Sequence, residues 1–152
     1  MRNGKAFGGG ILRSHEGTLI AAFYKEFGEF DVLQAEGLSL LYGLQLCTQR
    51  EVGNLLVEVD LKTLVTLVNS HAIGRWPLCN YINQICWHLL LLSASFTHVF
   101  QEANPVADAL ASLQLDADRV FTTIRQLPDR VRSLVYMDCI SFPFVRSRVI
   151  IR

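Results

Sequence analysis

A short apolar stretch that passes directly into a helical pattern constrains the fold of this chain more than any other feature. Residues 55–60, Leu-Leu-Val-Glu-Val-Asp, predict a strand that is buried on both faces, as in a parallel sheet. The next residues repeat apolar side chains at helical spacing, at Leu61, Leu64, Val65 and Val68. Asp60 therefore lies where a strand ends and a helix begins, which is where open α/β sheets collect ligands and catalytic groups. Asp60 either caps the helix or acts as a functional carboxylate, and this stretch alone leaves both interpretations open.

The length and composition indicate one ordinary domain. The 152 residues are 51% hydrophobic, which is enough to build a core. The start, Met1 to Lys5, is no secretory signal, and the apolar stretch 82–92 is shorter than the roughly 20 residues that cross a bilayer. We therefore expect an intracellular protein, in the nucleus or the cytoplasm, with no membrane partner. No two of the four cysteines form a C-x-x-C pair, so we expect reduced thiols and no zinc site.

The charge is balanced overall but unevenly distributed. From Arg119 to the end, seven arginines and two aspartates give a net charge of +5, so residues 1–118 carry −5. The arginines alternate with apolar residues, which is typical of a solvated surface. Contact with phosphate groups is the alternative interpretation of this basic tail.

The remaining patterns predict a mixed sheet with helices on both faces. Residues 7–13 and 18–24 predict a hairpin, and the glycines at 8–10 lack the spacing of a phosphate loop, so they indicate close packing or a bulge. The other expected elements are a helix from Asp31, a helix over 61–69, a long helix from Pro77, a strand over 95–100, a helix from Asn104 and a helix over about 118–126. For the apolar segments 131–137 and 145–151, the sequence does not decide between helix and strand.

Three acidic residues come from three different elements. Glu36 lies beside the apolar stripe of the first helix, Asp60 ends the central strand, and Asp108 lies in the first turn of the helix after Asn104. Each has an ordinary explanation: exposure to solvent for Glu36, a cap for Asp60, and a favourable helix-dipole position for Asp108. Gathered at one edge of the sheet, the three carboxylates would hold divalent metals, and two such metals can clamp a phosphodiester.

The motifs around these acids resemble the ribonuclease H type 1 domain, in the plant version derived from non-LTR retrotransposons. The matching segments are Arg2-Asn3-Gly4, Gly9 to Gly17, Gln34-Ala35-Glu36-Gly37-Leu38, Val57-Glu58-Val59-Asp60, His98 to Asn104, and Ala107-Asp108-Ala109-Leu110-Ala111. They cover residues 1 to about 115 in the right order and spacing. We therefore expect a ribonuclease H-like domain over 1–115, followed by a C-terminal helix and basic tail over 116–152.

This resemblance implies an endonuclease that cuts the RNA strand of RNA–DNA hybrids with two Mg²⁺ ions. By position, Glu36, Asp60 and Asp108 match the second, third and fourth carboxylates of the family's site, where they serve as catalytic residues and metal ligands. The family's proton-shuttling histidine is not carried over to His98, because the loop that follows, Gln101 to Pro105, is short.

The chain departs from the family at its start. The family's first carboxylate lies on its first, central strand, just upstream of the residues that match Arg2-Asn3-Gly4. The resemblance therefore implies an α/β, ribonuclease H-like sheet that lacks its first central strand, with weak Mg²⁺ binding and weak or absent cleavage. Residues 145–151 either fill the gap in the sheet or form a disordered end. A non-catalytic nucleic-acid-binding module and a degenerate relic are the alternative functions.

Overall fold

The computed structural model describes residues 4–71, 76–100, 104–141 and 147–151. The predictions for residues 1–3, 72–75, 101–103 and 145–146 lie outside the described residues.

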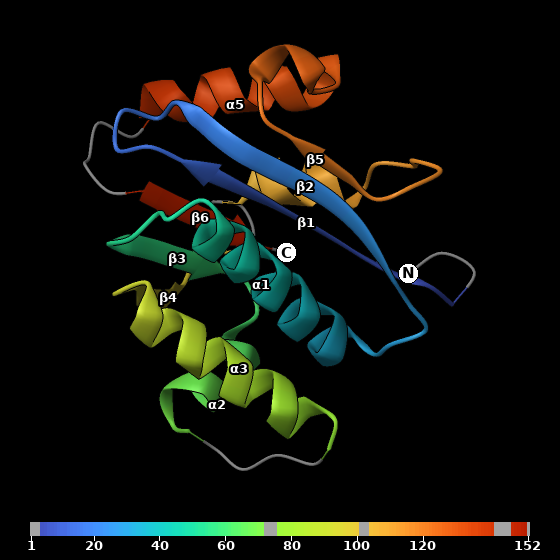
Figure 1. The fold of residues 1–152 in the computed structure, drawn as a ribbon. Coiled ribbons are helices and arrows are strands. Elements are labelled where there is room, and N and C mark those ends of the chain that lie inside the picture. Colours follow the sequence, from blue (N-terminus) through green and yellow to red (C-terminus); the bar gives the residue numbers. More distant parts are fainter. Residues whose placement is uncertain (1–3, 72–75, 101–103, 142–146, 152) are drawn as a thin grey trace.

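The described strands form one mixed sheet in the order β4-β3-β6-β1-β2-β5 (Figure 1). The strands are β1 (Ala6–Arg13), β2 (Leu19–Gly28), β3 (Leu55–Val59), β4 (Ser95–His98), β5 (Arg119–Phe121) and β6 (Ser147–Ile151). The helices are α1 (Val32–Gln49), α2 (Lys62–Asn69), α3 (Leu78–Leu91), α4 (Pro105–Ala111) and α5 (Asp129–Ser141), with a short 3₁₀ helix, η2 (Ile124–Gln126). The predicted mixed α/β sheet is confirmed, and the open segment 131–137 lies within α5.

The strand β6 fills the predicted gap in the middle of the sheet. It runs parallel to β3, with Ile151 beside Val59, and antiparallel to β1, with Ile151 beside Gly10. Of the two interpretations of the C-terminal segment, the strand is confirmed for residues 147–151. The sequence of β6 is Ser-Arg-Val-Ile-Ile, so this central strand brings no carboxylate into the sheet.

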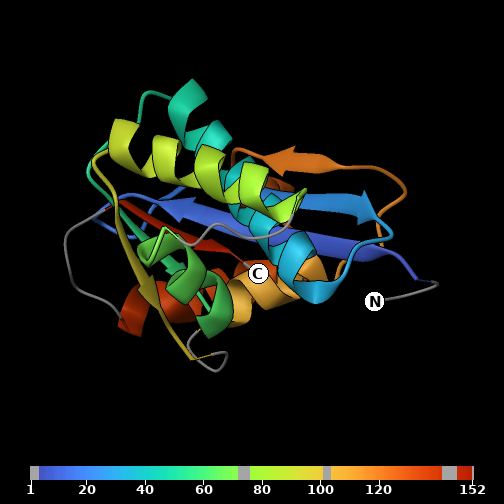
Figure 2. The same cartoon turned by 90° about the horizontal axis from the view of Figure 1, so that it is seen from below.

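Helices cover both faces of the sheet, as predicted. One apolar cluster joins β3 to α1, α2 and α3, and the other joins the β1–β2 hairpin and β5 to α4 and α5. Leu12 belongs to the first cluster and its neighbour Ile11 to the second, as the alternation of side chains along a strand requires. Figures 1 and 2 show α5 and α3 on opposite sides of the strands. Within the described ranges, no helix has the length and hydropathy that a membrane crossing requires.

The glycines of β1 let helices from both faces approach the sheet closely. A Cβ atom at Gly9 would lie 2.7 Å from Leu110 Cβ and would also meet the backbone of α4. A Cβ atom at Gly8 would lie 2.8 Å from the Cβ of Ser39 on α1. Both separations are shorter than real Cβ contacts, so the close-packing interpretation is confirmed for Gly8 and Gly9.

We expect Gly9→Ala to lower the free energy of unfolding by about 1–3 kcal/mol, because the added methyl meets helix backbone that cannot rotate away. Urea denaturation followed by circular dichroism measures this loss. Gly37→Ala is the matched control: it lies within α1, its Cβ would meet Leu78 Cδ1 at an ordinary 3.8 Å, and alanine is the better helix former. A Gly9→Ala protein as stable as Gly37→Ala would contradict the close packing.

The helix predicted over 118–126 is wrong. Residues Arg119–Phe121 form β5, which pairs antiparallel with β2, and the 3₁₀ helix η2 follows. The Asp118 carboxylate accepts hydrogen bonds from the backbone N–H of Glu26 (2.9 Å) and from Lys25 Nζ (2.7 Å), which holds this segment against the edge of β2. Phe121 is then buried in the core. The residues after 115 therefore add two strands, β5 and β6, to the same sheet.

A buried histidine links α1 to α3. His88 is 8% exposed, and its Nδ1 lies 3.0 Å from Thr48 Oγ1. Desolvation by burial lowers the pKa of His88. A histidine whose folded pKa is depressed stabilises the fold fully above its unfolded pKa of about 6.5, and this stability is lost as the pH falls through the folded pKa.

We therefore expect acidification from pH 7 to 5 to lower the melting temperature of the wild type more than that of His88→Gln. The substitution removes the group whose neutral form the fold prefers. Thermal denaturation across this pH range measures the difference. His15→Gln is the control, because this side chain is 60% exposed. The melting temperature of this variant should fall with pH as much as that of the wild type. If the melting temperature changes equally with pH in the wild type and in His88→Gln, burial of a neutral His88 does not contribute to the pH dependence of stability.

Candidate functional site

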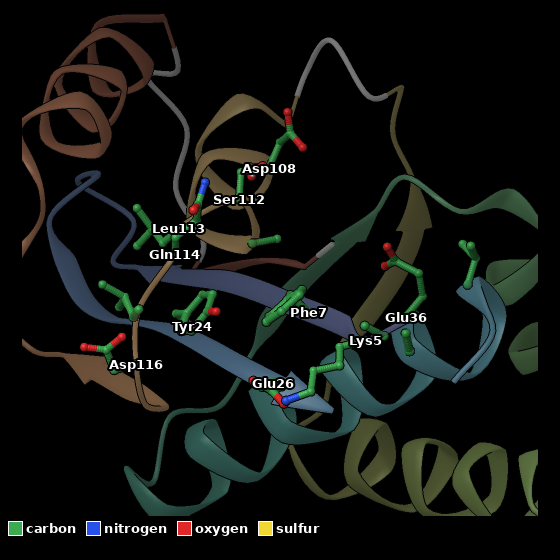
Figure 3. A pocket seen from close by; sticks show the side chains of 15 residues that line it. Lys5, Phe7, Tyr24, Glu26, Glu36, Asp108, Ser112, Leu113, Gln114 and Asp116 are labelled. Atoms are coloured by element: carbon green, nitrogen blue, oxygen red, sulfur yellow. Dashed lines mark hydrogen bonds and ion pairs between the residues drawn. The ribbon is translucent and has the colours of Figure 1, made fainter. Parts of the chain in front are cut away.

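A cavity of about 600 Å³ opens between α1, α4 and the β1–β2 hairpin (Figure 3). Phe7 on β1 and Tyr24 on β2 line its floor, and their rings are stacked with centroids 5.9 Å apart. Asp108 of α4 lies on one side and Glu36 of α1 on the other. Two of the three predicted acids therefore share one cavity.

The start of α1 fixes the position of Glu36. Asp31 caps this helix by accepting a hydrogen bond from the backbone N–H of Gln34 at 2.8 Å. Ala35 and Leu40 face the core, which leaves Glu36 half-buried at the rim of the cavity, with its Oε2 shielded from water. The expectation that Glu36 lies beside the apolar stripe is thus met.

The packing of α4 fixes the position of Asp108. Asn104 is fully buried at the N-cap, and Pro105 occupies the first turn, where its missing N–H costs no hydrogen bond. Val106 and Leu110 are fully buried, so Asp108 lies on the half-exposed side of the helix. The close approach of α4 to Gly9 therefore also sets the height of Asp108 above the sheet.

Asp60 directly follows β3 and is half-buried. Its capping interpretation is wrong, because the N-cap of α2 is Leu61. Asp60 does not line the cavity that Glu36 and Asp108 share. In the part of the chain that the structure describes, no three His, Cys, Asp or Glu side chains form a ready-made metal site. The three-acid site therefore stays a prediction.

The cavity carries an excess of negative charge. Its lining includes four carboxylates, of Glu26, Glu36, Asp108 and Asp116, and one ammonium group, of Lys5. Lys5 Nζ lies 2.6 Å from Glu26 Oε1, and this hydrogen bond, together with the charge of Glu26, raises the pKa of Lys5. The remaining carboxylates favour a cation in the cavity and disfavour a bare phosphate group.

Several lining residues were not among the predicted site residues. Phe7 pairs with Glu26, and Tyr24 pairs with Gly9, so all four positions lie on one face of the hairpin. The period-2 alternation of the predicted hairpin was the only signal for them. Asp116 follows α4 in a segment whose conformation no motif predicted.

The side chains predicted to bind Mg²⁺ carry the type of ligand atom that this ion prefers. Glu36, Asp60 and Asp108 offer only oxygen ligands, which Mg²⁺ prefers, and the negative cavity favours a divalent cation. The cavity brings together fewer of these ligands than predicted, because only Glu36 and Asp108 of the three acids line it and β6 adds no acid. This arrangement is suited to a loosely held ion.

Comparisons with known proteins agree with this fold. The model of the reverse transcriptase-like family matches residues 1–114. A protein of Arabidopsis thaliana named as a candidate ribonuclease H protein is 28% identical over 137 residues, which are 89% of this chain and 22% of that protein. The crystal structure of RNase H1 from the halophilic archaeon Halobacterium salinarum NRC-1 superposes with a TM-score of 0.64 and 23% identity, over 73% of this chain and 87% of that one. The chain therefore belongs to the reverse transcriptase-like family and has an RNase H-like fold.

Proposed function

We propose that this domain binds RNA–DNA hybrids at the cavity between α1 and α4 and hydrolyses the RNA strand with Mg²⁺, at a low rate. The observation that carries the proposal is the pairing of Glu36 and Asp108 in one negatively charged cavity on an RNase H-like fold. The Arabidopsis relative and the reverse transcriptase-like match support a plant, retrotransposon-derived origin.

The proposed roles follow from where the acids lie. Glu36 and Asp108, with Asp60 from the end of β3, would hold Mg²⁺, which when bound activates water and neutralises phosphate charge. Glu36 and Asp108 stand on helices that pack tightly on opposite faces of β1, so rigid elements set their separation. Because β6 supplies no further carboxylate, weak metal binding and slow cleavage are proposed.

A cleavage assay tests this proposal. The chain is incubated with a labelled RNA–DNA hybrid at increasing Mg²⁺, beside the Halobacterium salinarum RNase H1 as a positive control. We expect slow Mg²⁺-dependent cleavage of the RNA strand, which Glu36→Gln and Asp108→Asn each lower by about 100-fold or more, since even outer-shell partners of a metal are worth 10–100-fold.

Asp116→Asn is the matched control, because Asp116 lines the same cavity but lies outside the proposed ligand set. It should keep the wild-type rate within about threefold, since it removes only a more distant charge. Cleavage by Asp108→Asn at the rate of the Asp116→Asn control would contradict the proposed site. A rate equal to that of the positive control would contradict the proposed weakness.

A non-catalytic nucleic-acid-binding module is the second candidate. Arg119 on β5, Arg125 on η2 and Arg130 on α5 are exposed, and such arginines can contact phosphates without any metal. Hybrid binding in the presence of EDTA, with an affinity that falls as salt rises and with no cleavage in Mg²⁺, would favour this function. A folded chain that neither binds nor cleaves would favour the degenerate relic.

A further inference from the structure

The helix α3 carries an apolar face that the fold leaves uncovered. Trp87 is 58% exposed, Leu90 80% and Leu91 53%. Leu90 and Leu91 lie three and four residues after Trp87, one turn along the helix, so the three side chains form a single patch, which we call the α3 face. The opposite side of the helix packs against the core through Ile82, Ile85 and His88. The α3 face therefore consists of large side chains that nothing in the described structure requires to be apolar.

The α3 face lies at the outside of the molecule. In Figure 1, α3 runs along the side of α1 that is turned away from β1 and β2, and in Figure 2 it lies in front of the sheet. Trp76, just before the helix, is also 80% exposed. Asn80 and Asn83 are exposed between Trp76 and Trp87 on the same side of the helix.

The segment that carries this face has no formal charge. Residues 76–100 contain no Asp, Glu, Lys or Arg, although charged residues make up 18% of the whole chain. A nucleic acid is therefore a poor occupant, because binding its phosphates requires Lys or Arg. A lipid surface is also a poor occupant, because interfacial helices carry Lys and Arg on their polar face.

We propose that the α3 face is the contact between two copies of this chain, related by a two-fold axis that passes near Leu90. Two identical faces can meet without like-charge repulsion only if they are neutral or self-complementary, and the α3 face is neutral. With the axis near Leu90, the leucines of both copies form the centre and the Trp87 rings cover them from either side. Asn80 and Asn83 then lie at the rim, where interfaces are polar.

The small size of the face makes this a weak dimer. Trp87, Leu90 and Leu91 expose less than the roughly 800 Å² per partner of a standard interface. We therefore expect a dissociation constant on the order of 10–100 µM and a monomer in dilute solution. This contact does not depend on the proposed nuclease function.

Sedimentation equilibrium of the chain from about 5 to about 500 µM tests the proposal. A reducing agent is included, because Cys79 and Cys86 are half-exposed thiols that could cross-link copies. We expect the weight-average mass to rise with concentration and to level off at twice the monomer mass. Trp87→Glu and Leu90→Glu should each remain monomeric over the whole range, with unchanged circular dichroism because both side chains are exposed.

Two further samples make the test specific. Tyr136→Glu replaces an aromatic residue of similar exposure (54%) on α5 and should dimerise like the wild type. An equal mixture of Leu90→Glu and Leu90→Lys should form a heterodimer, because the opposite charges meet at the proposed axis, whereas each variant alone stays monomeric.

A wild type that is monomeric at every concentration would overturn the proposal, whatever other protein the face binds. Unchanged dimerisation of Leu90→Glu would overturn it too, as would growth to larger aggregates with no plateau. Failure of the mixed charge variants to pair would rule out the axis near Leu90.

Discussion

A chain that ends at Ser141, and so lacks β6, is expected to lose its cooperative fold. The strand β6 pairs with β3 on one side and with β1 on the other, so its removal divides the sheet at its centre. Buried backbone groups of Leu55–Val59 and Gly10–Arg13 then lose their partners on that side. We expect loss of most of the roughly 5–15 kcal/mol that stabilises a typical domain.

Urea denaturation followed by circular dichroism measures this effect. A chain that ends at Ile151 keeps every paired residue of β6 and is the matched control. Val149→Pro is a second, smaller change: it removes one backbone N–H from a strand that is paired on both sides, where proline is not tolerated. If the chain ending at Ser141 unfolds at the same urea concentration as the control, β6 is not part of the sheet in solution.

Asp138→Ala is expected to destabilise the protein by about 3–5 kcal/mol. Asp138 on α5 forms an ion pair with Arg13 at the end of β1, and the two side chains are only 8% and 4% exposed. Removing the carboxylate leaves the guanidinium buried without its counter-charge, which costs far more than the loss of an exposed ion pair. Thermal and urea denaturation measure the change in the free energy of unfolding.

Two control variants separate buried charge from lost packing. Asp129→Ala breaks the Arg132–Asp129 pair, in which Asp129 is 95% exposed, and should change stability by no more than about 1 kcal/mol. The double variant Arg13→Met with Asp138→Leu removes both charges and should recover most of the loss. An Asp138→Ala protein within about 1 kcal/mol of the wild type would show that water reaches this pair.

The local patterns predicted most of the elements because each depends on neighbours in the sequence. The apolar run 55–59 and the stripe through Leu40 and Leu44 needed only strand and helix periodicity. The apolar spacing over 118–126 suits a helix and equally a strand followed by a 3₁₀ turn. What decides between them is the bonding of Asp118 to β2, some 90 residues earlier.

The site was only partly predictable for the same reason. The helical position of Glu36 and Asp108 followed from their own segments, and the motif order indicated that they belong together. The cavity they share depends on how α1 and α4 approach β1, which Gly8 and Gly9 permit. The pairing of β6 with β1 joins residues more than 130 positions apart, and no local pattern specifies such a partner.

The position of β6 also has a consequence for biosynthesis. It is translated after the other described strands, yet it joins the two halves of the sheet. At a bacterial or eukaryotic elongation rate of about 5–20 residues per second, β1 and β3 wait on the order of ten seconds for their common neighbour. During that interval two facing sheet edges are open to other extended chains, so the nascent chain should be most prone to aggregate before β6 is made.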